Sequence, residues 1–147
     1  GSAELDRILA CREMMGGLPM AIEFRHGSWL TVQRRGHVFG FLRENGLTYV
    51  TADEPQFGTL ATVPFLPETT TDIAYLRLHG RNTDTWLRKG VETSARYDYL
   101  YSGEELRALA IAARELSARA RVVYLLFNNC RAGHAMQNAL EMVRLLG

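Results

Sequence analysis

Four short apolar runs along this chain each end in charged or amide side chains. The runs cover residues 21–26, 48–54, 74–79 and 122–129. Segments with helical spacing or loop composition separate them, so the pattern predicts repeated strand–crossover units. Polar groups would then gather at the carboxyl ends of the strands, which is where α/β sheets and barrels bind their ligands.

The spacing of apolar and turn-forming residues predicts the boundaries of the elements. We expect strands over residues 20–25, 48–53, 74–79 and 121–127. We expect helices over residues 4–15 and 28–44, after a capping box at 102–105, and from about residue 132. Ser28 is the expected N-cap of the second helix. The last helix is expected to bury the apolar residues Ala135, Met136, Ala139, Leu140 and Val143.

Two segments show no helical period. Residues 55–71 contain three prolines, and residues 80–101 form a long stretch rich in aromatic and polar side chains. Loops as long as residues 80–101 are often functional lids in compact domains, so we expect this segment to lie over a site.

The order of the elements predicts an α/β protein with parallel strands and right-handed crossovers. A complete (β/α)8 barrel needs about 250 residues, whereas this chain offers four strand–crossover units. We therefore expect half of a TIM-type barrel over residues 3–147, with Gly1-Ser2 as a tag remnant. Such a half exposes two sheet edges and an apolar interior, so we expect a homodimer or association with a complementary half barrel.

Composition excludes several classes of protein. The 147 residues are 47% hydrophobic, and the formal charge is +1 with basic side chains spread along the chain. This argues against a strongly basic nucleic-acid footprint and leaves a local patch open. No apolar stretch approaches about 20 residues and no secretory signal is present, so we expect no membrane association. Cys11 and Cys130 lack metal or CxxC spacing, which favours reduced thiols in a cytoplasmic protein.

Five motifs in this order resemble the DUF72 (YecE-like) proteins, a family of unassigned function. They are residues 22–26 with Ser28-Trp29, Asp53-Glu54-Pro55, residues 75–82, residues 96–102, and residues 124–129 with Gly133-His134-Ala135 leading to Asn138-Ala139. The resemblance implies a TIM-type barrel related in shape to the xylose-isomerase and endonuclease IV group. It covers only the C-terminal half of that barrel, strands five to eight. A site built from both halves would therefore be incomplete in one copy.

Strand alternation predicts a charged cluster in the barrel interior. Glu23 and Arg25 share one face of the first strand, and Arg77 and His79 share one face of the third. We expect Glu23 to pair with Arg77, because an unpaired buried charge costs several kcal/mol. Two roles remain open, an ion network that fills the interior and the mouth of an anion-binding pocket. In the second role Arg25 and Arg77 bind the anion, while His79 with Glu23 or Asp53 transfers protons.

Further candidate residues follow the last strand. Asn128 and Asn129 end it, and Gly133 stands at the start of the final helix. TIM barrels often hold phosphate in this region, because free N–H groups at a helix N-terminus favour anions. The two asparagines are equally suited to satisfying loop backbone, so both roles stay open.

The long loop and the first turn add the remaining candidates. Asn82, Trp86, Arg96 and Tyr97 lie in the loop and are candidate ligand-binding residues. Trp86, Arg96 and Tyr97, with Asp98 and Tyr99, would form a lid that stacks on a sugar, a base or another ring. Aromatic and arginine side chains also suit single-stranded nucleic acid, at about 1–3 kcal/mol per base. The alternative is a loop packed over the barrel end or in a dimer contact. His26 is a further ligand candidate, although we favour a role in stabilising its own turn.

A metal site would draw on His79, Glu23 and Asp53. The spacings HxH, HxxxH and HExxH are absent, and two neighbouring arginines would repel a divalent cation. We therefore expect neither a metal nor a cofactor.

These observations favour an enzyme, or the remnant of one, acting on an anionic ligand that is phosphorylated or nucleotide-like. No motif specifies a reaction type. Two alternatives remain open, a non-catalytic nucleic-acid-binding module and a fragment of a longer protein with no activity of its own.

Overall fold

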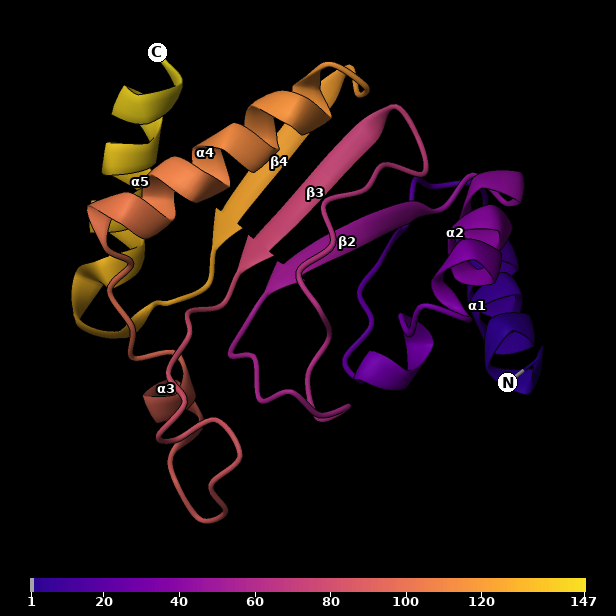
Figure 1. Cartoon of the computed structure of the whole chain (residues 1–147). Coiled ribbons are helices and arrows are strands. Elements are labelled where there is room, and N and C mark those ends of the chain that lie inside the picture. The colour runs from indigo at the N-terminus through magenta and orange to yellow at the C-terminus, as the bar shows by residue number, and fades with distance from the viewer. Residues whose placement is uncertain (1) are drawn as a thin grey trace.

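The computed structural model describes residues 2–147 and contains one sheet of four parallel strands (Figure 1). The strands are β1 (Ala21–Ile22), β2 (Thr48–Asp53), β3 (Ile73–Leu78) and β4 (Val122–Phe127), and they lie side by side in chain order. The four predicted strands are confirmed, although β1 keeps only two paired residues. Parallel neighbours in chain order, alternating with helices, form an α/β fold consistent with half of a TIM-type barrel.

Helices and loops connect the strands on one side of the sheet. The helices are α1 (Ser2–Met14), α2 (Arg35–Glu44), α3 (Thr93–Arg96), α4 (Gly103–Ser117) and α5 (His134–Leu146), with short 3-10 turns at Gly27–Trp29 and Arg131–Gly133. Helix α4 lies over β3 and β4, and α5 packs against α4 (Figure 1). The predicted capping box is confirmed, because Ser102 and Glu105 exchange side-chain and backbone hydrogen bonds at the start of α4.

The sheet has one packed face and one open face. Ala74, Leu76 and Leu78 alternate along β3 and are fully buried against α4, where Leu106 and Leu109 meet them. A fully buried leucine of this kind contributes about 2 kcal/mol through the water it excludes. The hydrophobic core therefore sits between the sheet and α4.

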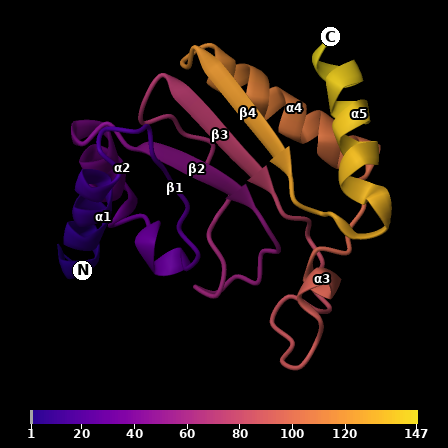
Figure 2. The same ribbon diagram turned by 180° about the vertical axis from the view of Figure 1, so that it is seen from behind.

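The residues of opposite parity face the open side, seen from behind in Figure 2. Tyr75 and Arg77 of β3 lie opposite Tyr124 and Leu126 of β4. The β4 side chains remain 48% and 40% exposed, and the rings of Tyr75 and Tyr124 are 5.8 Å apart. In a closed barrel this face would line the interior.

Residues 28–44 do not form one helix, so the prediction of Ser28 as an N-cap was wrong. His26 caps the 3-10 turn instead, because its Nδ1 atom accepts a hydrogen bond from the Ser28 N–H at 3.3 Å. The backbone of Gly27 is bound by the loop of residues 55–71, because the Gly27 N–H donates a hydrogen bond to Leu60 O at 2.9 Å. A Cβ at Gly27 would lie 2.6 Å from Thr62 O, so the segment is packed too closely for a longer side chain.

Helix α5 presents a different face from the one predicted. Met136, Leu140 and Val143 are more than half exposed, whereas Asn138 and Met142 are buried. Asn138 accounts for this rotation, because its amide bonds both backbone groups of Tyr101 and is fully buried. The prediction that five apolar residues of α5 face inward was therefore wrong. The hydrogen bonds of the Asn138 amide decide instead which face of the helix is buried.

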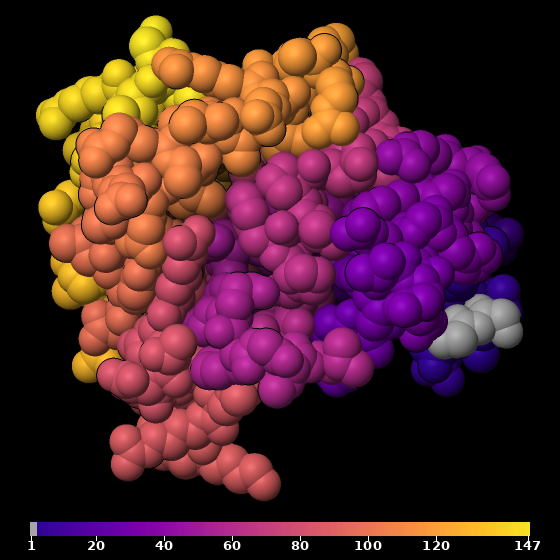
Figure 3. All heavy atoms as spheres, in the orientation of Figure 1, coloured from indigo at the N-terminus to yellow at the C-terminus, as the bar shows by residue number. Residues whose placement is uncertain are grey.

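The loop of residues 80–101 projects beyond the carboxyl ends of the strands (Figure 1) and forms the protrusion at the bottom of the space-filling view (Figure 3). Its only helix among the described residues is the four-residue α3. Residues 55–71 also contain no helix there, as their three prolines predict. Both loops leave the sheet at the end where the candidate site residues lie.

Candidate functional site

His79 is the centre of a polar cluster at the carboxyl end of β3. Its side chain is 1% exposed, and its two ring nitrogens each have a partner. Nε2 lies 3.1 Å from Glu23 Oε1, and Nδ1 lies 3.1 Å from the amide nitrogen of Asn128. Arg25 Nη1 also lies 3.1 Å from Nε2. Glu23, Arg25 and Asn128 thus hold the His79 ring in one orientation.

Glu23 joins this histidine to two arginines. Arg77 Nη1 lies 2.5 Å from Oε2 and Arg25 Nη1 lies 2.5 Å from Oε1. The predicted Glu23–Arg77 pair is therefore confirmed. Burial raises the pKa of Glu23, but the hydrogen bonds from His79, Arg25 and Arg77 outweigh it and lower the pKa to about 2. Glu23 is ionised at neutral pH and holds the three cationic or polar groups together.

Glu54 belongs to the same cluster and was not among the predicted site residues. It is 2% exposed, and its Oε1 atom accepts a hydrogen bond from the Val63 N–H at 2.7 Å. Its Oε2 atom lies 3.9 Å from Arg25 Nη2. Burial raises the pKa of Glu54, and the Val63 N–H and Arg25 oppose that effect without cancelling it. The sequence alone could not place Glu54 here, because its parity with Val50 and Ala52 puts it on the face of Arg77 only once the register of β2 and β3 is known.

Two aromatic rings from the long loop cover His79. Its ring centroid lies 6.2 Å from that of Trp86 and 5.8 Å from that of Tyr97. Trp86 and Tyr97 also pack on each other in a T-shaped arrangement at 5.7 Å, and the Arg25 guanidinium lies 6.0 Å from the Trp86 ring. Trp86 is only 8% exposed, so the loop already shields the histidine from solvent.

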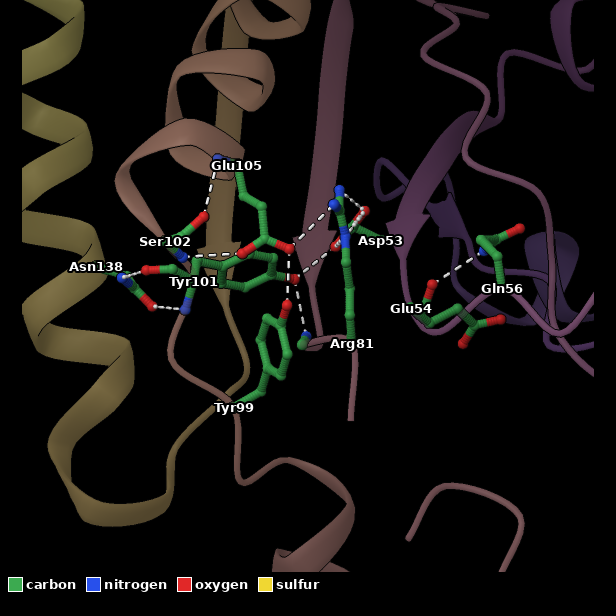
Figure 4. Close-up of polar contacts among 10 residues, drawn as sticks. Asp53, Glu54, Gln56, Arg81, Tyr99, Tyr101, Ser102, Glu105 and Asn138 are labelled. Carbon is green, nitrogen blue, oxygen red and sulfur yellow. Dashed lines mark hydrogen bonds and ion pairs between the residues drawn. The ribbon is translucent and has the colours of Figure 1, made fainter. Parts of the chain in front are cut away.

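Asp53 lies apart from this cluster. It is paired in register with Leu78, which faces α4, so its side chain points to the packed side of the sheet. Arg81 binds it through two atoms, with Nη2 2.7 Å from Oδ1 and Nε 3.0 Å from Oδ2, and the Tyr101 hydroxyl donates to Oδ2 at 2.6 Å. Arg81 also reaches Glu105 at 3.2 Å (Figure 4).

This Asp53 cluster ties β2, the start of the long loop and the first turn of α4 together. The hydroxyl of Tyr99 donates to Glu105 at 2.7 Å, and burial followed by that hydrogen bond raises the pKa of Tyr99 to about 12. Burial and the adjoining Asp53 carboxylate likewise raise the pKa of Tyr101. In Figure 4 the side chains of Asp53 and Glu54 run in different directions, although the residues are neighbours in sequence.

Two of the loop candidates stay within the loop. The Asn82 amide donates to Ala95 O and Asp98 O at 3.2 and 2.9 Å, which fixes the loop's own backbone. Arg96 lies in the short α3, and its buried Nε atom has no hydrogen-bond partner among the described residues. His26 stabilises its own turn, which is the role that we favoured for it.

The residues after β4 divide between the two clusters. Asn128 bonds His79, whereas Asn129 is fully buried and donates to Tyr99 O and to Asn138 at 2.8 and 2.9 Å. Gly133 adopts a left-handed conformation with φ of 79° at the start of α5. The carboxylate of Asp98 already lies at this helix start, 3.6 Å from His134 Nδ1.

The Glu23 cluster opens onto the open face of the sheet. A depression of about 270 Å³ is lined there by Ala21, Glu23, Val50, Tyr75, Arg77 and Leu126. A larger hollow of about 410 Å³ lies between α2 and residues 66–68 and contains none of the Glu23 cluster. We take the smaller depression as the entrance to the candidate site, because Glu23 and Arg77 form its wall.

Two other features, a metal-binding cluster and a membrane-spanning helix, can be assessed over residues 2–147. No group of three or more His, Cys, Asp or Glu side chains in this part of the chain has the geometry to hold a metal ion. None of its helices has the length and apolarity to span a membrane.

The sequence of residues 1–147 matches the family model described as a protein of unknown function, DUF72. The chain belongs to the DUF72 family. A DUF72 relative of Bacillus subtilis strain 168, the UPF0759 protein YunF, is 32% identical over 139 residues, which are 92% of this chain and 49% of that protein.

Solved DUF72 structures share the fold as well as the sequence. A DUF72 protein of Enterococcus faecalis has 34% identity and a TM-score of 0.92 over 99% of this chain and 54% of its own. A DUF72 protein of Thermotoga maritima has 44% identity and a TM-score of 0.77 over 87% of this chain and 46% of its own. The chain therefore spans about half the length of the relatives it matches.

Proposed function

We propose that this chain carries the anion-binding part of a site at the carboxyl ends of barrel strands, and that its ligand is a small phosphorylated or nucleotide-like molecule. The observation that carries the proposal is the convergence of Arg25 and Arg77 on Glu23 beside His79. Both guanidinium groups keep an exposed side, since their side chains are 49% and 34% exposed. A planar guanidinium with free N–H groups is suited to phosphate or carboxylate.

The proton-carrying residue of this proposal is His79. Histidine is the side chain that most often serves in proton transfer. Glu23 supports it as an orienting partner, because an acid with a pKa of about 2 is ionised at neutral pH and binds protons weakly. Asp53 is less suited to proton transfer, because Arg81 and Tyr101 occupy both of its oxygens on the packed side of the sheet.

The test is a binding screen with paired compounds. A sugar phosphate and a nucleoside monophosphate are each compared with the unphosphorylated parent by thermal shift and calorimetric titration. Arg77→Ala is expected to weaken binding of the phosphorylated compounds about ten- to a hundredfold, because a charge-assisted hydrogen bond contributes about 1.5–3 kcal/mol.

The matched control is Arg121→Ala. Arg121 pairs with Asp72 in a surface contact where the two side chains are 71% and 60% exposed, at the other end of the sheet. This variant is expected to bind as the unchanged chain does. Equal binding of phosphorylated and unphosphorylated compounds, or equal effects of the two substitutions, would contradict the proposal.

We propose in addition that the open face is covered by a second half barrel, which in a preparation of this chain alone is a second copy. The support is the half-length match to solved relatives together with the exposure of Tyr124 and Leu126. Light scattering on a size-exclusion column is expected to give twice the chain mass of 16.6 kDa. Leu126→Glu is expected to return the mass to that of one chain, and a monomer before substitution would refute the idea.

A cytoplasmic location belongs to the same proposal. Cys11 and Cys130 are both free and exposed, which suits a reducing compartment. A nucleic-acid interface receives less support, because the Trp86 and Tyr97 rings assigned to stacking pack on each other and on His79.

A further inference from the structure

Glu54 is a buried carboxyl whose two oxygens have unequal surroundings. Oε1 is held by the Val63 N–H at 2.7 Å, which fixes the side chain. Oε2 points at Arg25 but stays 3.9 Å from its Nη2 atom, beyond the length of a hydrogen bond. One oxygen is therefore positioned by the backbone, and the other faces the arginine that we assign to anion binding.

The charges that face Glu54 come from three elements. Arg25 and Glu23 stand on the segment after β1, His79 follows β3, and Tyr49 lies on β2. Arg25 already has a close partner in Glu23 at 2.5 Å. Glu54 is thus a second carboxyl group beside the Arg25 guanidinium, which is already paired with Glu23. Glu54 itself is only 2% exposed to solvent.

A bound oxyanion would complete this arrangement. An oxyanion that takes the exposed side of Arg25 would come close to the Glu54 carboxylate, and two negative charges in such a place repel each other. A protonated Glu54 removes that repulsion, and its O–H can donate a hydrogen bond to an oxygen of the ligand.

We propose that Glu54 is the residue that becomes protonated when an anion binds, so that an oxyanion binds at Arg25 together with one proton taken up from solvent by Glu54 Oε2. This inference rests on the proposed anion-binding function. It adds a chemical requirement for the ligand, which must present an oxygen that accepts a hydrogen bond beside the one that meets Arg25. The raised pKa of Glu54 is in the direction this coupling needs.

The coupling predicts the direction in which the affinity for the anion changes with pH. Below the pKa of Glu54 the carboxyl is already protonated, and affinity does not change with pH. Above it each bound anion must bring a proton, so the affinity falls by up to about tenfold per pH unit.

The experiment uses inorganic sulfate, whose charge is constant across the range. Binding is measured by calorimetric titration between about pH 5 and pH 8, in pairs of buffers with different ionisation heats that report the protons taken up. We expect proton uptake approaching one per sulfate at the upper end. Glu54→Gln keeps the acceptor for the Val63 N–H, and it is expected to bind without proton uptake and with a flat pH profile.

Glu115→Gln, on the exposed side of α4, is the control and is expected to keep the pH dependence. Sulfate binding without proton uptake by the unchanged chain would overturn the role of Glu54 and leave the anion site standing, whether or not the Gln variant folds. Proton uptake that persists in Glu54→Gln would assign it to His79 and would also overturn the inference. Absence of sulfate binding at every pH would refute the anion site itself.

Discussion

Removing Arg81 is expected to destabilise the protein more than removing Asp53, although the two residues form one ion pair. The reason is the unequal burial of the partners. The Asp53 side chain is 2% exposed and the Arg81 side chain is 35% exposed. Each truncation strands the other charge, and the stranded charge costs more where water cannot reach it.

The structure gives an estimate for each substitution. Arg81→Ala leaves Asp53 with the Tyr101 hydroxyl at 2.6 Å as its remaining close side-chain partner, so we expect a loss near the lower end of the buried-pair range, about 3 kcal/mol. Asp53→Ala leaves Arg81 a third exposed and still 3.2 Å from Glu105, so we expect about 2 kcal/mol. At this chain length a loss of 3 kcal/mol lowers the melting temperature by about 6–12 °C.

Urea denaturation of the single variants Arg81→Ala, Asp53→Ala and Asp53→Asn, and of the double variant Arg81→Ala with Asp53→Asn, measures these free energies of unfolding. The second change removes the stranded charge and keeps an acceptor for Tyr101, so the double variant is expected to regain about 1 kcal/mol over Arg81→Ala. Arg121→Ala, which breaks an exposed pair, is expected to cost under about 0.5 kcal/mol. Equal losses for Arg81→Ala and Asp53→Ala, or a double variant that is the sum of its parts, would refute the burial argument.

Two further predictions concern the site and the loop that covers it. Glu23 has a pKa lowered from 4.5 to about 2, so its stabilising effect is present above 4.5 and lost as the pH falls through 2. Glu23→Gln is therefore expected to lose about 3 kcal/mol at neutral pH and to match the unchanged chain near pH 2, and urea midpoints that differ by the same amount at both pH values would disagree. Gly80 and Gly133 both have positive φ, of 91° and 79°, but a Cβ at Gly80 would lie 2.7 Å from Tyr99 Cβ whereas one at Gly133 meets nothing within 4 Å. Gly80→Ala is expected to cost about 3 kcal/mol and Gly133→Ala about 1, and similar melting temperatures for the two variants would show that the close approach does not matter.

The signals that predicted the fold correctly were local ones. The capping box of Ser102 and Glu105 brings its own partners within one turn, so the start of α4 could be identified without knowledge of the rest of the chain. The strands could be located because short runs rich in apolar and β-branched residues, bounded by turn-forming residues, are typical of strands. The second helix could not, because His26 and Leu60 compete for the backbone that Ser28 was expected to cap.

The candidate site was predictable where one face of a strand is polar. On β3 the alternation of buried and partly exposed residues places Arg77 and the following His79 on one side, and the Glu23–Arg77 pair followed from it. On β2 all six residues are buried, so the sequence carries no contrast between the two faces. The choice between Asp53 and Glu54 as the residue beside His79 could not be made from such a strand.

The sequence by itself determined that the chain is α/β, that polar groups follow its parallel strands, and that its motifs are those of DUF72. These properties depend on residues close together in the chain, where turn chemistry and apolar spacing act directly. Only the tertiary structure decided which face each strand presents, that Asn138 turns the apolar stripe of α5 outward, and that Glu54 joins Arg25 while Asp53 joins Arg81. Those choices depend on register and on buried hydrogen bonds between segments far apart in sequence, where a shift of one residue along a strand exchanges its two faces.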